Sequence, residues 1–229
     1  YADYGAHKDL LQDLLLFYSS SEKKLVTLKE YVSRMKEDQK YIYYACGETV
    51  ERIDLLPQTE ALKEKGYEIL YLTDNVDEFA LRIMMKYDDK EFRSVSADDL
   101  GLETEEEKKA AEKQVEENKD LLAFLRDSPD GKVKAVILSQ KLKSHPVCLS
   151  TEGAISMEME KVLNSMPMPE GEKVQAQRVL EINANHPIFT KLTKLYADGD
   201  KERAAKYAKL LYNQALLIEG VSIEDPLAF

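Results

Sequence analysis

The sequence of 229 residues is short of cysteine, of positive charge and of long apolar runs. Its two cysteines, Cys46 and Cys148, are about a hundred positions apart without a CxxC spacing, which is typical of reduced thiols in a cytosolic protein. No apolar run approaches the roughly 18–20 residues that span a bilayer, and the N-terminus lacks the charged-then-apolar pattern of a signal peptide. We therefore predict a cytoplasmic protein without a membrane partner.

The deficit of positive charge limits the choice of partner. Lysine and arginine total 32 against 43 aspartates and glutamates, which gives a net charge of −11. Nucleic acid binding depends on cations that displace counterions from phosphates, so we exclude nucleic acid as a predicted partner. Hydrophobic residues make up 44% of the chain, which is enough to build buried cores. The length predicts one or two domains.

The common catalytic motifs are also missing. The sequence contains no GxxxxGK[ST] phosphate loop, no GxGxxG, HExxH or GxSxG motif, and no paired cysteines for a metal. The three histidines, His7, His145 and His186, are scattered, and isolated histidines of this kind are usually structural or exposed. Cys46 ends a predicted apolar strand, so we expect an inert thiol. We predict no catalytic residue, metal ligand or bound cofactor in this chain.

The first hundred residues predict a small parallel sheet flanked by helices. A strand, a helix and a second strand follow one another within about thirty residues, which is typical of a βαβ crossover. Pro57 separates two short helical pieces, and Gly66 stands where a helix C-terminus favours glycine. We predict strands over residues 41–46, 67–72 and 92–95, and helices over residues 5–18, 48–56, 58–65 and 76–86.

An acidic stretch, residues 96–117, separates this region from the rest. It has almost no large apolar side chain after Leu102, so we predict a solvated helix or linker. The fold class is therefore α/β (α+β), with domains at residues 1–97 and 121–229 joined by an acidic helical region, 98–120. In the second, helix-rich α+β domain we predict strands over residues 133–138, 147–150 and 178–182, and helices over residues 151–166, 187–196 and 200–219.

Two of these helices carry more apolar surface than usual. In residues 151–166 a stripe of apolar side chains lies beside several methionines, which supply a deformable surface for varied partners; an ordinary core helix is the alternative. Polar residues including Ser156 are expected to rim the stripe. The helix over residues 200–219 is apolar beyond one face, so a helix from a second copy is one way to cover it. The two stripes are Ile155, Met159, Val162 and Leu163, and Ala204, Ala208, Leu211, Ala215 and Ile218.

A different function is suggested by the ends of the predicted strands. Gly47, Asp74 and Asp77 follow strands at the positions where α/β folds bind ligands. The alternative function is therefore a small-ligand α/β enzyme. Capping of the next helix is the favoured interpretation of the two aspartates.

Blocks of sequence in order along nearly the whole chain resemble the heat-shock protein 90 chaperones of the bacterial HtpG type. The matching blocks are TLKEYVSRMK (27–36) followed by Gln39, IYY (42–44), EILYLTD (68–74), VDEF (76–79), FRSVS (92–96), LLYNQALL (210–217) and EDP (224–226). The resemblance implies a dimeric chaperone, driven in full-length members by ATP and Mg, that contacts unfolded or partly folded client proteins.

The resemblance also implies roles for particular residues. It places Phe79 and the stripe Ile155, Met159, Val162 and Leu163 in client binding, and the stripe of residues 200–219 in homodimerisation. It further implies that this chain is a fragment, holding the end of the middle domain and most of the C-terminal domain, with the last helix cut near Pro226 and without the nucleotide-binding domain. Such a fragment is not expected to hydrolyse ATP.

Overall fold

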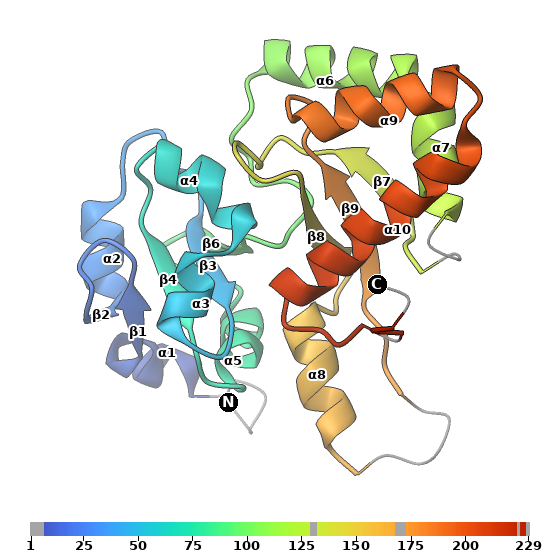
Figure 1. Cartoon of the computed structure of the whole chain (residues 1–229). Coiled ribbons are helices and arrows are strands. Elements are labelled where there is room, and N and C mark those ends of the chain that lie inside the picture. The colour runs from blue at the N-terminus through green and yellow to red at the C-terminus, as the bar shows by residue number, and fades with distance from the viewer. Residues whose placement is uncertain (1–6, 129–131, 168–172, 224, 228–229) are drawn as a thin grey trace. The chain divides into compact units, whose positions relative to one another are not determined.

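A computed structural model describes residues 7–128, 132–167, 173–223 and 225–227. The start of the predicted helix over residues 5–18 lies outside these ranges. The chain divides into two compact units, whose elements are labelled in Figure 1. The first unit contains the described residues up to Leu55, together with Leu62–Gly101 and those of Ile155–Gln175. The second contains Leu56–Ala61, Leu102–Ala154 and the described residues from Ala176 onward.

The first unit is built on a six-stranded sheet with the order β2-β1-β4-β3-β6-β5. The predicted parallel core is confirmed, because β3 pairs in parallel with both β4 and β6. The strands are β1 (Leu16–Ser19), β2 (Leu25–Thr27), β3 (Ile42–Cys46), β4 (Ile69–Leu72), β5 (Lys86–Tyr87) and β6 (Lys90–Ser94). The helices are α1 (Lys8–Leu11), η1 (Gln12–Leu14), α2 (Leu28–Arg34), α3 (Val50–Asp54), α5 (Asp77–Met84) and α8 (Met157–Ser165), and α4 (Glu60–Glu64) contains the junction between the units.

The predicted helix over residues 5–18 is wrong beyond residue 14, because its last part forms β1. Leu10 and Leu14, which the helical interpretation buries, are 75% and 72% exposed. Phe17 and Ser19 are instead buried in alternation with Leu16 and Tyr18, which is the period of a strand. Antiparallel β1, β2 and β5 therefore extend the predicted parallel sheet on both sides.

A buried tyrosine connects the helix layer of this unit to its sheet. Tyr31 of α2 donates its hydroxyl proton to the Glu68 carbonyl oxygen at 2.7 Å. The Tyr31 hydroxyl oxygen in turn accepts hydrogen bonds from Gln39 Nε2 and from the backbone N–H of Tyr43. Because all three partners lie in or beside β3 and β4, this hydroxyl fixes α2 against the parallel core that carries the site described below.

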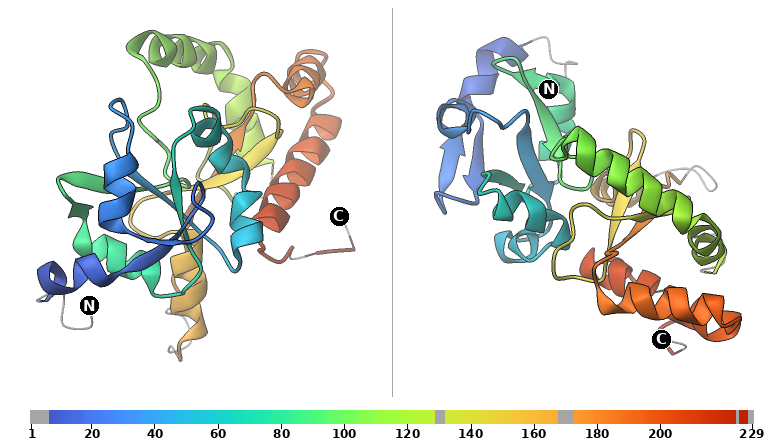
Figure 2. Two further views of the ribbon diagram at one scale, coloured as in Figure 1. Left: turned by 90° about the vertical axis from the view of Figure 1, so that its left-hand side faces the viewer. Right: turned by 90° about the horizontal axis from the view of Figure 1, so that it is seen from above.

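The second unit contains a three-stranded sheet with the order β7-β9-β8. β9 (Gln177–Ile182) pairs in parallel with β7 (Ala135–Leu138) and antiparallel with β8 (Val147–Glu152). Around the sheet are η2 (Pro57–Thr59), α6 (Glu105–Glu117), α7 (Lys119–Asp127), α9 (Pro187–Ala197) and α10 (Lys201–Ile218). α10 lies along this sheet and packs against β8 and α9 (Figure 2). As predicted for the acidic stretch, α6 buries none of its side chains.

Segment 56–61 is held in the second unit by a cluster of hydrogen bonds around Glu60. Its carboxylate accepts from the backbone N–H groups of Lys143 at 2.7 Å and Ser144 at 3.1 Å. It also contacts the Ser144 hydroxyl and lies 2.8 Å from His145 Nδ1. Burial opposes ionisation, but these hydrogen bonds outweigh it and lower the pKa of Glu60 to about 2.

We expect the Glu60 cluster to make stability fall in acid. The pKa of Glu60 is lower in the folded chain than its ordinary value of 4.5, so its contribution is complete above pH 4.5 and disappears as the pH falls toward 2. Solvent reaches the half-exposed His145 and weakens the interactions of the Glu60 carboxylate. The contribution of Glu60 to the free energy of unfolding is therefore about 1–2 kcal/mol. Urea melts of wild type and Glu60→Gln should therefore differ at pH 6 and converge near pH 2. A constant difference would contradict the assignment.

Candidate functional site

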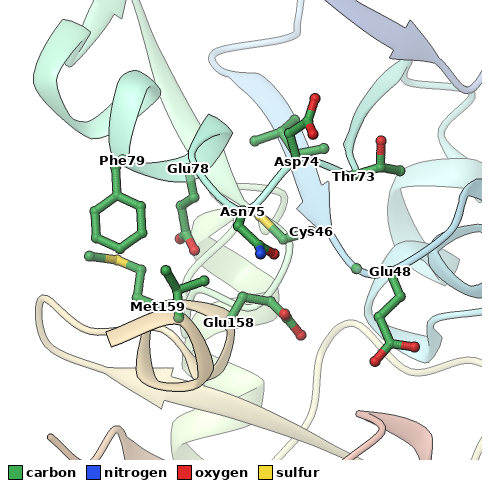
Figure 3. Close-up of a pocket in the computed structure, with 12 residues that line it drawn as sticks. Cys46, Glu48, Thr73, Asp74, Asn75, Glu78, Phe79, Glu158 and Met159 are labelled. Atoms are coloured by element: carbon green, nitrogen blue, oxygen red, sulfur yellow. The ribbon is translucent and has the colours of Figure 1, made fainter. Parts of the chain in front are cut away.

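The first unit contains a small pocket at the carboxyl ends of β3 and β4. The chain passes from β3 to its neighbour β4. It then returns in the opposite direction along the sheet, past β3, to β6. The pocket therefore lies where the winding of the sheet changes direction, a usual position for ligands in α/β folds. It encloses about 40 Å³. Its lining residues, shown in Figure 3, are Cys46, Gly47, Glu48, Leu72, Thr73, Asp74, Asn75, Glu78, Phe79, Glu158, Met159 and Val162.

The size and charge of this pocket do not fit a nucleotide or a typical substrate. Ligand pockets usually enclose about 300–1,000 Å³, far more than the 40 Å³ here. Four of the lining side chains, Glu48, Asp74, Glu78 and Glu158, are carboxylates, which repel phosphate groups. Within the described ranges no group of three or more His, Cys, Asp and Glu residues is arranged to hold a metal ion.

Of the residues of the alternative enzyme hypothesis, Gly47 and Asp74 line this pocket and Asp77 does not, and all three have structural roles. A Cβ atom on Gly47 would lie 2.8 Å from Cγ1 of Ile53, so the close approach of α3 requires glycine there. Asp77 begins α5, and its backbone N–H donates to the Asp74 carbonyl oxygen at 3.0 Å. Burial raises the pKa of Asp77 and outweighs a hydrogen bond from the Asp74 backbone, which lowers it. The small-ligand enzyme is therefore not favoured.

Cys46 does not have the environment of a reactive nucleophile. Burial first, and then the negative charge of Glu78, raise the pKa of its thiol well above the ordinary value. The thiolate is the reactive form of cysteine, so a raised pKa keeps Cys46 protonated and unreactive. This agrees with the prediction from the sequence.

One wall of the pocket is α8, which is anchored through Ser156. The Ser156 hydroxyl oxygen accepts a hydrogen bond from the Met159 backbone N–H at 3.1 Å and so caps the helix N-terminus. Its proton is donated to Oε2 of buried Glu78 in α5. Oε1 of Glu78 accepts from the Tyr44 hydroxyl and pairs with Arg82, both at 3.3 Å. Glu78 therefore joins α8 to the sheet.

The sequence did not identify Glu78 or Ser156 as anchors. The sequence predicts Ser156 on the polar rim of α8, but this residue is only 7% exposed, so that prediction is wrong. The predicted helix 151–166 also begins later, at Met157, because residues 151 and 152 belong to β8. A serine directly before an apolar helical stripe is a typical N-cap, and this was the available signal.

The structure brings together three of the five residues that the sequence assigned to client binding. Phe79 of α5 and Met159 and Val162 of α8 line the same pocket, and Figure 3 shows the Phe79 ring facing the Met159 side chain. Ile155 and Leu163 do not line it. Within α8 only Met157 is fully buried, whereas the predicted stripe is half-buried. A half-buried apolar stripe is compatible with contact to a partner, and the client assignment stays a prediction.

The predicted dimerisation residues lie on the inner side of α10. Ala204, Ala208, Leu211 and Ala215 are 0–4% exposed within the second unit, and Ile218 is half-buried. The exposed apolar side chains of the helix are instead Leu210 and Leu217, at 43% and 48%. The helix is therefore apolar on more than its packed face, as the sequence indicated. The role of the five predicted residues in self-association stays a prediction.

Comparison with known proteins gives a consistent result over the whole chain. The sequence model of a family described as Hsp90 protein matches residues 2–229. Proteins named Chaperone protein HtpG are 61% identical in Clostridium acetobutylicum, 59% in Halalkalibacterium halodurans and 57% in Clostridium botulinum strain Langeland, each over 100% of this chain. The chain spans 36% of the length of these curated relatives. No helix among the described residues is long and apolar enough to cross a membrane. With its mixed α/β units and this match, the chain belongs to the Hsp90 family of chaperones.

Proposed function

We propose that this chain is a client-contacting and self-associating part of a cytoplasmic chaperone that works as a homodimer and, as a whole, uses ATP and Mg. The chain itself carries no catalytic residue in this proposal and does not hydrolyse ATP. Its partners are unfolded or partly folded proteins and a second copy of itself, and neither nucleic acid nor membrane is among them.

The observation that carries the client proposal is the pairing of Phe79 with Met159 and Val162 around one pocket. These side chains come from α5 and α8, which are far apart in the sequence, and together they form one apolar surface. Methionine is flexible and polarizable, so it adapts to partners of different shape. Such a surface suits weak contacts with many unfolded segments better than tight recognition of one ligand.

The client proposal is tested with Phe79→Ala and Met159→Ala in the 229-residue chain. Because Met159 is half-buried, we expect its truncation to lower the free energy of unfolding by only about 1 kcal/mol, below the range of about 2–5 kcal/mol for a core methionine. Binding of a labelled unfolded polypeptide should weaken about fivefold to tenfold in each variant. Leu55→Ala, at a side chain 76% exposed and outside the pocket, is the matched control and should change neither quantity. Unchanged client binding in both pocket variants would refute the proposal.

Self-association is tested on the exposed side of α10. Leu210→Glu or Leu217→Glu places a charge where a second copy would bury apolar surface, so either change should shift any dimer to monomer. Light scattering over a range of concentrations measures the mass. Leu25→Glu, at a leucine 59% exposed in the first unit, controls for the added charge. Wild-type mass in both α10 variants at every concentration would place the interface elsewhere.

A further inference from the structure

The second unit contains a larger cavity, of about 240 Å³, that the chaperone proposal does not use. It lies between one face of α10, the start of β9 and the segment that follows α10. Its lining combines cationic, polar and apolar side chains: Lys132, Arg178, Lys209, Tyr212, Asn213, Leu216, Val221, Ser222, Ile223 and Asp225.

Two buried polar side chains of α10 face this cavity without a protein partner. Lys209, Tyr212, Asn213 and Leu216 stand at positions i, i+3, i+4 and i+7, so they share one face of the helix. Tyr212 is 2% exposed and Asn213 is 9% exposed. Neither side chain forms a hydrogen bond with another described residue. The polar atoms of both side chains are open to solvent in the cavity and not enclosed, so the Asn213 amide is available there for hydrogen bonds with a polar ligand.

The charges around the cavity favour an anion. Three cationic side chains, Lys132, Arg178 and Lys209, line it together with a single carboxylate, Asp225. This local excess of positive charge stands in a chain whose net charge is −11. Hydrogen bonds between cations and a carboxylate or phosphate are about twice as strong as those between neutral groups.

The apolar part of the lining narrows the class of anion that the cavity can bind. Leu216, Val221 and Ile223 are apolar and would not solvate a small inorganic ion such as phosphate, but they suit the hydrocarbon part of an organic acid. We propose that this cavity binds a small organic carboxylate, with its carboxyl group among the three cations and the Asn213 amide and its apolar body against Leu216 and Ile223. The volume is below that of sites for drug-sized molecules, so the ligand has about the size of one amino acid residue.

Such a carboxylate is either a free acid or the C-terminal residue of a polypeptide. Isothermal titration of the 229-residue chain with N-acetyl-leucine, N-acetyl-leucinamide, a tetrapeptide ending in leucine and inorganic phosphate separates these cases. We expect N-acetyl-leucine to bind at least tenfold more tightly than the amide and than phosphate, and binding to weaken as salt rises. Tighter binding of the tetrapeptide identifies a polypeptide C-terminus as the ligand. Equal binding of acid and amide, preference for phosphate, or no binding of either carboxylate overturns the proposal.

Two variants test whether N-acetyl-leucine binds in this cavity. Lys209→Gln changes an exposed side chain, and Asn213→Leu replaces the amide by an apolar group of similar shape. Each variant should weaken the binding of N-acetyl-leucine at least fivefold. Lys206→Gln is the matched control, because Lys206 lies on the same helix, pairs with Glu202 and does not line the cavity. An equal loss in Lys206→Gln would mean unspecific attraction by α10 and would also overturn the proposal.

Discussion

Replacing Lys141 by methionine should lower the free energy of unfolding of the second unit by about 3–5 kcal/mol. Lys141 Nζ lies 2.5 Å from Oε1 of Glu181, and the two side chains are 4% and 1% exposed. Oε2 of Glu181 accepts a hydrogen bond from the Ser139 hydroxyl at 2.6 Å. Because Glu181 is in β9, the central strand of the sheet, the change leaves a carboxylate in the core without its counterion.

Denaturant melts of wild type and Lys141→Met measure this loss, and they are compared with melts of one rescue variant and one control variant. The double variant Lys141→Met/Glu181→Leu removes both charges and should recover most of the loss, since apolar replacements of a buried pair are often neutral. Lys134→Met breaks the ion pair with Glu152, whose side chains are 46% and 47% exposed, and should cost less than about 1 kcal/mol. A loss below about 1 kcal/mol for Lys141→Met would show that solvent reaches Glu181.

Local sequence signals were sufficient for the parallel core of the first unit. The aromatic and β-branched run before Gly47 and the run after Gly66 both form strands, β3 and β4, that are buried along most of their length. A strand that is buried on both faces has an unmistakable composition. The helix before β4 was equally clear, because Pro57 and Gly66 mark its start and its end.

The strands outside the parallel core were harder to predict because their signals are short or ambiguous. The leucines of residues 10–15 have helical spacing, and pairing with β2 and β4 makes residues 16–19 a strand. The turn between β5 and β6 has Asp88 and Asp89 at φ +47° and +59°, which is the left-handed region. Such turns usually carry Asn-Gly or Asp-Gly, so the Asp-Asp pair gave no clear hairpin signal.

The candidate site depends on contacts that no local pattern reports. The client assignments of Phe79 and of the α8 stripe came from the family resemblance, but the resemblance did not predict that α5 and α8 lie close together. Their proximity rests on a hydrogen bond between Ser156 and Glu78, which are 78 positions apart. The sequence treated Ser156 as solvent-facing because periodicity assigns polar residues to the outside. A buried polar pair between distant elements is the feature that a periodicity argument misses.

That pair leads to the second large expected effect. Ser156→Ala removes the cap of the α8 N-terminus, worth about 0.5–2 kcal/mol, and the hydrogen bond to the buried Glu78 carboxylate, worth about 1.5–3 kcal/mol. We expect the local stability of α8 to fall by about 2–4 kcal/mol, because both interactions are made by one hydroxyl. Amide hydrogen exchange in α8 should then accelerate by about 30-fold to 1,000-fold, while exchange in β3 and β4 stays close to wild type.

Two further variants decide whether the anchor or the helix itself is responsible. Ser165→Ala removes a hydroxyl that donates to the Val162 carbonyl oxygen at the exposed end of the same helix, and it should leave exchange nearly unchanged. Ser156→Thr keeps both interactions and should restore most of the protection. If exchange in Ser156→Ala equals that of wild type, Glu78 does not hold α8. If α8 opens and client binding weakens with it, the apolar surface of Phe79, Met159 and Val162 depends on this one hydrogen bond to keep its two halves together.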